Sequence, residues 1–199
     1  MNNEKLIIDF MKQNNGLITS KQISELKIPR INLTRMIEKK LIEREKRGLY
    51  VLPSVWGDEY FNLLFSVEST VFSYGTALYL LGLSERVPSI YDVTVPAGFN
   101  VESIRKNKSV KLHYVKKELF NLGKAEVKSP QGQLVDCYNA ERCICDLIKD
   151  KDFQDAELFK YAIKEYLNNK KGKDLIRLNK YSKELGVEKE VRNYLEVLL

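Results

Sequence analysis

The chain has 199 residues, of which 44% are hydrophobic and 30% charged, and this composition is typical of a folded protein rather than a disordered one. It contains neither a run of about 18 apolar residues nor a secretory signal at its N-terminus, so we expect a cytoplasmic protein without a membrane span. The formal net charge of +6 is concentrated in residues 1–53, which hold 11 Lys or Arg against 6 Asp or Glu, whereas residues 54–199 hold 22 against 21. This asymmetry predicts a polyanionic partner for the N-terminal quarter.

The first predicted elements are three short helices. Apolar residues recur at helical spacing from about residue 4 to residue 14. Thr19 and Gln22 then have the spacing of a capping box, which starts a second helix over 20–26. A third helix follows Pro29. This order of helices and turn is typical of a helix-turn-helix.

A basic ribbon follows the third helix. Residues 41–44 and 49–52 read as two strands, and Gly48 supplies the turn between them. The ribbon is the wing of a winged helix. Since an α-helix fills the major groove and a basic ribbon reaches the neighbouring phosphates, the predicted partner is double-stranded DNA.

The residues expected to contact DNA come from the third helix and the wing. Two alternatives remain open: the charges form only a solvated helix face, or the winged helix docks a protein instead of DNA. The expected DNA-binding residues are Arg30, Asn32, Thr34, Arg35, Lys39, Lys40, Arg44, Lys46 and Arg47.

The remaining sequence predicts an α+β fold, in which an N-terminal winged helix-turn-helix is followed by a mixed α+β domain with a helical C-terminal half. The expected domains are a DNA-binding domain over 1–53, a linker over 54–69 and a C-terminal domain over 70–199. The predicted elements of the C-terminal domain are a helix over 74–81, strands over 91–98, 111–115, 124–128 and 133–138, and helices over 139–149, 155–168, 174–185 and 188–198.

The cysteines and the histidine do not have metal-ligand spacing. Cys137, Cys143 and Cys145 lie far from His113 in the sequence, so we expect reduced thiols, no metal and no cofactor. The chain also lacks a phosphate-binding glycine motif and a His-based triad, so no enzymatic activity is expected.

Three further features have competing interpretations. Asp92 with Glu126 and Lys128 resembles a nuclease metal site, but alternating polar residues in exposed strands often produce Glu-x-Lys by chance. Arg142 and Asp146 are spaced as a local i, i+4 ion pair worth a few tenths of a kcal/mol. The basic region 170–192 is either a second anion-binding surface or a set of solvent-facing helices.

Four segments in series carry a resemblance to a known family: LTRMIEKKLIEREKRGLYVLP, FSYGTALYLLGL, YDVTVPAG and NAERCICDLI. Together they resemble the AbiEi antitoxins of abortive-infection, type IV toxin-antitoxin systems. The resemblance implies a winged helix that represses its own operon and a C-terminal domain that counteracts a cognate nucleotidyltransferase toxin, without implying a direct complex. Within the C-terminal motifs the candidate residues are Ser73, Thr76, Arg142 and Asp146.

Two expectations accompany the resemblance. Because one module of about 50 residues reads few base pairs, we expect a protein that is monomeric in solution to place two copies on an inverted-repeat operator. Lys27 and Lys40 stand where related sequences often have glycine, which predicts local differences at the helix ends. The alternative function is a winged-helix transcriptional regulator with a ligand-sensing C-terminal domain.

Overall fold

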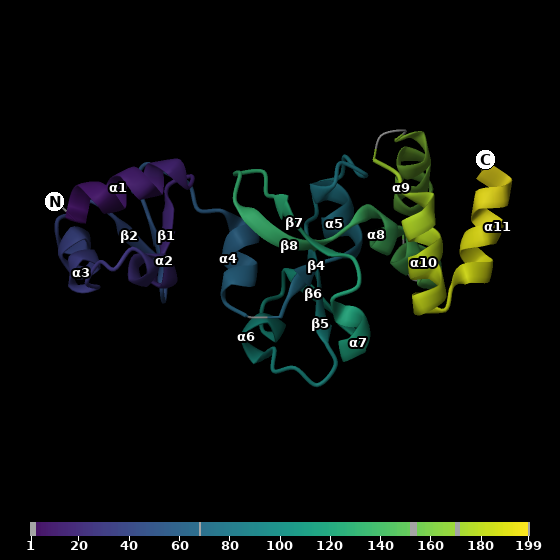
Figure 1. Cartoon of the computed structure of the whole chain (residues 1–199), viewed down its shortest axis with the longest axis horizontal. Helices are drawn as coiled ribbons and strands as arrows, with labels where there is room; N and C mark the ends of the chain where they lie inside the picture. The colour runs from purple at the N-terminus through teal and green to yellow at the C-terminus, as the bar shows by residue number, and fades with distance from the viewer. Residues whose placement is uncertain (1–2, 68, 152–154, 170–171, 199) are drawn as a thin grey trace. The chain divides into compact units, whose positions relative to one another are not determined.

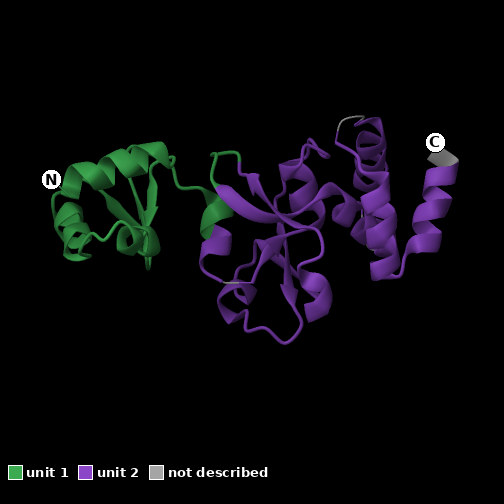
Figure 2. Ribbon diagram, viewed as in Figure 1, with its two compact units in different colours: residues 1–62, 130–133 green, residues 63–129, 134–199 purple. Residues whose placement is uncertain are grey.

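The computed structural model describes residues 3–67, 69–151, 155–169 and 172–198, with side chains described up to residue 196. The chain divides into two compact units: residues 1–62 with 130–133, and residues 63–129 with 134–199 (Figure 2). Among the described residues, no helix is long and apolar enough to cross a membrane. The predicted α+β class is confirmed.

The first unit contains the predicted winged helix-turn-helix (Figure 1). Its strands form one antiparallel sheet in the order β1-β3-β2, and β2 and β3 are the two strands of the wing. The elements are α1 (Asn3–Gln13), β1 (Leu17–Thr19), α2 (Ser20–Glu25), α3 (Ile31–Glu38), β2 (Glu43–Lys46) and β3 (Leu49–Val51).

The start of α2 is fixed by the predicted capping box. The backbone N–H of Gln22 donates to Thr19 Oγ1 at 3.1 Å, and the backbone N–H of Thr19 donates to Gln22 Oε1 at 2.8 Å. Two backbone donors that the helix leaves unpaired are thereby satisfied. The prediction of a capping box is confirmed.

Helices α2 and α3 are each followed by a lysine at the position where the backbone takes a left-handed conformation. Lys27 and Lys40 both have φ of 56°. After α3, the Lys40 N–H donates to Ile37 O and the Leu41 N–H donates to Met36 O, both at 2.9 Å, which is the Schellman pattern. Thus the helices end as they would with glycine, while the lysine Cβ adds about 1 kcal/mol of strain.

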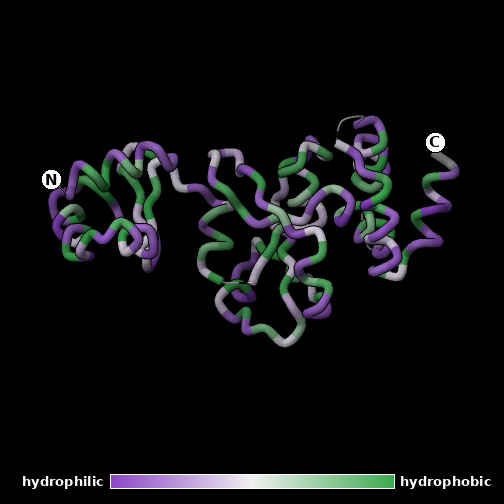
Figure 3. The backbone as a smooth tube through the Cα atoms, in the orientation of Figure 1, coloured by the Kyte–Doolittle hydropathy of each residue, from purple (hydrophilic) through white to green (hydrophobic). Residues whose placement is uncertain are grey.

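One hydrophobic core holds the first unit together. Each helix contributes one apolar face, and the alternation of hydrophobic and hydrophilic residues along the chain is visible in Figure 3. The buried cluster is made of Ile7, Met11, Ile18, Ile23, Ile28, Leu33, Met36 and Ile42.

The second unit is built on a mixed five-stranded sheet of order β6-β5-β4-β8-β7. The pairs β4–β5 and β7–β8 are antiparallel, whereas β4–β8 and β5–β6 are parallel. Consequently β6 and β7 are the edge strands. The strands are β4 (Val71–Phe72), β5 (Tyr91–Pro96), β6 (Val110–Val115), β7 (Lys124–Lys128) and β8 (Leu134–Tyr138).

Helices α8 to α11 gather on one side of this sheet in Figure 1. Strand β4 and the helices α4, α6 and α7 were not predicted, and α4 lies inside the segment 54–69 that was expected to be a linker. The domain boundaries drawn from the sequence stay a prediction. The helices are α4 (Glu59–Phe65), α5 (Tyr74–Leu80), α6 (Glu102–Arg105), α7 (Lys117–Phe120), α8 (Ala140–Lys149), α9 (Ala156–Asn168), α10 (Leu175–Leu185) and α11 (Glu188–Leu198).

Candidate functional site

Helix α3 presents one solvent-exposed face. Leu33 and Met36 are buried in the core, so Thr34 and Arg35 project away from it. Ile31, which is 53% exposed, shares this face at the i, i+3, i+4 spacing. Ile31 was not among the residues predicted to bind DNA, although its spacing from Thr34 and Arg35 could have identified it. The face therefore combines a cation, a hydroxyl and apolar groups, all of which can read base edges in a major groove.

The wing presents two exposed arginines. Arg44 lies on β2 and Arg47 lies in the turn before Gly48, and both are exposed. The pairing of β2 with β3 shifts register between Arg44 and Lys46, so the simple alternation of side chains is broken there. The Lys46 ammonium donates to the backbone carbonyl of Asn62 at 2.8 Å. Lys46 is thus hydrogen-bonded within its own unit, whereas Arg44 and Arg47 have no side-chain partner among the described residues.

Three other predicted DNA-binding residues have partners inside the first unit: Lys39, Asn32 and Arg30. Lys39 pairs with Glu4 of α1, at 2.5 Å. The Asn32 amide donates to the Pro29 carbonyl at 2.8 Å. Lys40 is exposed at its left-handed position.

The Arg30 guanidinium donates to the Ser24 hydroxyl at 3.2 Å. Contacts of this kind, on exposed side chains, are weak enough to exchange for phosphate contacts. The predicted residues that need no such exchange are Thr34, Arg35, Lys40, Arg44 and Arg47, for which no side-chain partner occurs in the described part of the chain.

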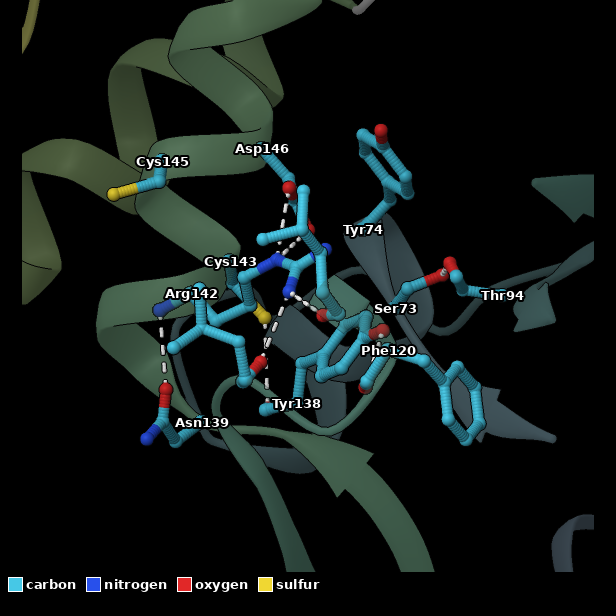
Figure 4. A network of polar contacts seen from close by, with 12 residues as sticks. Ser73, Tyr74, Thr94, Phe120, Tyr138, Asn139, Arg142, Cys143, Cys145 and Asp146 are labelled. Carbon is cyan, nitrogen blue, oxygen red and sulfur yellow. Dashed lines mark hydrogen bonds and ion pairs between the residues drawn. The ribbon is translucent and has the colours of Figure 1, made fainter. Parts of the chain in front are cut away.

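In the second unit, Arg142 lies at the centre of a buried network (Figure 4). Its Nε donates to both carboxylate oxygens of Asp146, at 3.0 and 2.9 Å. Its Nη1 donates to the backbone carbonyls of Leu119 and Leu122, at 2.8 and 2.9 Å. The guanidinium carbon also lies 4.3 Å from the centroid of the Tyr138 ring. The arginine therefore joins α8 to the segment around α7 and to β8.

Burial changes the nature of this ion pair. The side chains of Arg142 and Asp146 are only 2% and 8% exposed. The sequence predicted a local pair worth a few tenths of a kcal/mol, and this magnitude is wrong, since it applies to pairs on a solvated helix surface. Burial raises the pKa of Asp146 to about 6, against the opposing effect of Arg142.

Ser73 and Thr76 are also completely buried. The Thr94 hydroxyl donates to the Ser73 hydroxyl oxygen at 2.8 Å, and the backbone N–H of Asp92 donates to Thr76 Oγ1 at 2.8 Å. Both residues therefore fix the start of α5 to strand β5. None of the four candidates in the C-terminal motifs presents a side chain to solvent. Replacing them would therefore affect a toxin only by changing the stability or shape of the second unit.

Tyr74, beside this network, has an unusual backbone conformation with φ of 43°. Its ring stacks on His113 at a centroid distance of 4.1 Å, and its hydroxyl donates to Asp150. His113 Nε2 lies 2.7 Å from Asp92 Oδ1. Burial, reinforced by the charge of Asp146, raises the pKa of the Tyr74 hydroxyl. These contacts keep Tyr74 a neutral hydrogen-bond donor between α5 and the end of α8.

The nuclease interpretation is wrong. Asp92 lies on β5 and Glu126 on β7, and strands β4 and β8 separate them in the sheet. Three strand spacings correspond to roughly 14 Å, too far for two carboxylates to share a metal ion. Asp92 is instead held by His113.

The three cysteines are buried free thiols. The thiols of Cys137 and Cys143 both contact the Tyr138 carbonyl, at 3.3 and 3.5 Å. Burial raises the pKa of Cys145 to about 12 and also raises the pKa of Cys143. A thiolate is therefore disfavoured, and the cysteines fill the core between β8 and α10.

The C-terminal basic region is interleaved with acids. Lys170 and Lys171 lie outside the described residues. Arg177 pairs with Asp174 at 3.2 Å and reaches Glu141 at 3.7 Å. Lys183 and Arg192 both approach Glu188, at 3.7 and 3.3 Å. These contacts favour solvent-facing helices over a second anion-binding surface in this region.

Comparison with known proteins finds a family match within the first unit. Residues 5–53 match the family described as "Transcriptional regulator, AbiEi antitoxin", which confirms the resemblance for this segment. No curated protein matches the chain. Among solved structures, the crystal structure of RV2827C protein from Mycobacterium tuberculosis has 8% sequence identity and a TM-score of 0.46, and the match covers 92% of this chain and 77% of that one.

Proposed function

Because residues 5–53 match the family of AbiEi antitoxin transcriptional regulators, we propose that this chain binds an inverted repeat in its own promoter and represses the operon. The observation that carries the proposal is the coincidence of two features. The family match covers the winged helix, and the same segment presents the exposed side chains of Arg35, Arg44 and Arg47 without protein partners among the described residues.

The proposed binding mode follows from the two exposed surfaces. Helix α3 enters the major groove, where Arg35 donates to a guanine and Thr34 contacts a base edge. The wing lies along the adjacent backbone, where Arg44 and Arg47 neutralise phosphates. In this mode α3 supplies sequence specificity and the wing supplies affinity.

The second part of the proposal is that the second unit counteracts a nucleotidyltransferase toxin encoded beside this chain. The motifs FSYGTALYLLGL and NAERCICDLI of this unit support it, together with the antitoxin description of the family that residues 5–53 match. Since Ser73, Thr76, Arg142 and Asp146 are buried, the surface responsible is made by other residues, and these four maintain it.

Promoter binding is tested by fluorescence anisotropy with a labelled fragment of the upstream region, titrated at several salt concentrations. The intact protein should bind with a steep salt dependence, and the Arg35→Ala, Arg47→Ala double variant should bind far more weakly. Lys5→Ala, Lys12→Ala is the matched control, because it removes two exposed cations from α1 in the same unit. Equal binding by the double variant and the intact protein would exclude the proposed interface.

Toxin antagonism is tested by co-expression with the product of the adjacent gene, with growth as the readout. The intact chain should restore growth. The Arg35→Ala, Arg47→Ala variant should restore it equally, since the proposed antitoxin surface lies in the second unit. Failure of the intact chain to protect would refute this part of the proposal and leave promoter binding unaffected.

A further inference from the structure

A segment of the second unit carries a concentrated positive charge. Residues 103–117, SIRKNKSVKLHYVKK, contain six Lys or Arg and no Asp or Glu. They form the end of α6, all of β6 and the start of α7. All six cations are exposed: Arg105, Lys106, Lys108, Lys111, Lys116 and Lys117.

Most of these cations form no ion pair within the described part of the chain. Lys106 pairs with Glu102 at 3.0 Å. For Lys108, Lys111, Lys116 and Lys117, no ion pair occurs within the described part of the chain. By contrast, glutamates are interleaved with the cations of α10 and α11, where Lys183 and Arg192 approach Glu188. Like charges so close together repel one another unless an anion lies among them.

The same segment exposes aromatic rings. Tyr114 on β6 is 52% exposed, and Arg105 Nη2 donates to its hydroxyl at 3.2 Å. This contact places a guanidinium at the tip of the ring. Phe99, just before α6, is 39% exposed. Exposed rings beside cations are the groups on which unpaired bases stack.

A hollow of about 580 Å³ adjoins the segment at α6, and its lining includes Phe99, Asn100, Lys106 and the Glu102 carboxylate that pairs with Lys106. The Asn100 carbonyl oxygen accepts from the Glu102 N–H at 3.1 Å, while its amide nitrogen has no partner among the described residues. An aromatic ring and an amide donor thus line one hollow, beside an ammonium group that Glu102 neutralises. The ring and the amide suit a base, and the phosphates fall to the lysines outside the hollow.

Edge position adds to the accessibility of this surface. Strand β6 pairs only with β5, so its outer side is not covered by another strand of the described sheet. A nucleic acid strand lying along β6 would pass the lysines that precede and follow it in the chain. A closed duplex offers phosphates to the lysines, but it does not offer unpaired bases to Tyr114 and Phe99.

We propose that residues 99–117 of the second unit form a binding surface for single-stranded nucleic acid. Lys108, Lys116 and Lys117 bind the phosphates, and Tyr114 and Phe99 stack on the bases. Lys111 is not included, because it lies three residues from Tyr114 on β6 and its side chain points to the opposite face of the sheet. This function is additional to operator binding and does not depend on it, since it uses a different unit and a different form of nucleic acid.

The experiment uses the full chain with Arg35→Ala and Arg47→Ala, so that the winged helix contributes little. Binding of labelled oligo(U) and oligo(dT), each about 15 nucleotides long, is compared with binding of a duplex of the same length. Both single strands should bind more tightly than the duplex. A preference for oligo(U) identifies RNA as the ligand, and a preference for oligo(dT) identifies DNA.

Three further variants test the residues. Replacing Lys108, Lys116 and Lys117 by Gln should lower the log–log salt slope by about 2.1, the value for three phosphates at 0.7 each. The matched control replaces three exposed lysines of α9 and α10 and should keep the full slope. Tyr114→Ala should weaken single-strand binding about fivefold or more and leave duplex binding unchanged. The control lysines are Lys160, Lys164 and Lys180.

The far-ultraviolet circular dichroism spectrum and thermal transition of each variant should match those of the parent, which excludes unfolding as the cause of lost binding. Equal losses in the two lysine variants would overturn the proposal, because binding would then follow total charge. Tighter binding of the duplex, or unchanged single-strand binding by Tyr114→Ala, would overturn it as well.

Discussion

Two ion pairs of the second unit share the same i, i+4 spacing but lie in different surroundings. The side chains of Arg142 and Asp146 are 2% and 8% exposed, whereas those of Arg192 and Glu188 are 66% and 38% exposed. The buried pair is also bonded to two backbone carbonyls. Removing one partner of a buried pair leaves a charge without compensation, whereas an exposed pair is replaced by water.

We therefore predict that Arg142→Met lowers the free energy of unfolding by about 3–5 kcal/mol, because Asp146 and two carbonyls lose their donor. Arg192→Met is the control and should change stability by less than about 0.5 kcal/mol. Urea denaturation followed by circular dichroism measures both. A loss of similar size in the two variants would contradict the role assigned to burial.

Lys27 provides a second prediction at the level of one residue. Its φ of 56° is a conformation that glycine adopts without strain. Lys27→Gly should therefore stabilise the first unit by about 1 kcal/mol. Lys27→Ala keeps a Cβ and should give no such gain, so equal stabilisation by both replacements in urea denaturation would show that backbone strain is not the cause.

At the scale of elements, α3 is expected to contribute sequence specificity to DNA binding and the wing to contribute affinity. Arg35→Ala should reduce discrimination between the operator and a base-substituted operator by about 1–3 kcal/mol, because it removes a base contact. Arg47→Ala should weaken binding to all sequences alike and lower the salt slope by about 0.9. Competition titrations with both DNAs measure the two effects, and identical behaviour of the two variants would refute this division.

Elements with strong local signals were predictable from the sequence. The capping box of Thr19 and Gln22 fixes the start of α2 through contacts three residues apart. Strand β4 is different, because its two residues form a strand only by pairing with β5 and with Cys137 of β8. Such pairing depends on distant parts of the chain and leaves no periodicity to read.

The candidate sites were likewise predictable only where their geometry depends on neighbouring residues in the sequence. The exposed face of α3 follows from helical spacing, which is local. The burial of Arg142 depends on the Leu119 and Leu122 carbonyls, and the engagement of Lys46 depends on the Asn62 carbonyl. Backbone acceptors carry no signal in the sequence, so these contacts could not have been predicted from it.

At the scale of the whole molecule, the two compact units suggest that the two proposed activities can be separated. In a strain that carries a promoter reporter and the toxin, Arg35→Ala, Arg47→Ala should abolish repression and retain protection. A fragment over 54–199, if circular dichroism shows it to be folded, should protect without repressing. Loss of protection in the folded fragment but not in the double variant would mean that the first unit contributes to the antitoxin surface.

The central claim, operator binding through α3 and the wing, is tested most directly by a footprint on the chain's own promoter. The intact protein should protect two half-sites of an inverted repeat, separated by about 10 base pairs or a multiple of that spacing. The Arg35→Ala, Arg47→Ala variant should leave both half-sites open at the same concentration. Protection of a single half-site, or equal protection by the variant, would contradict the claim.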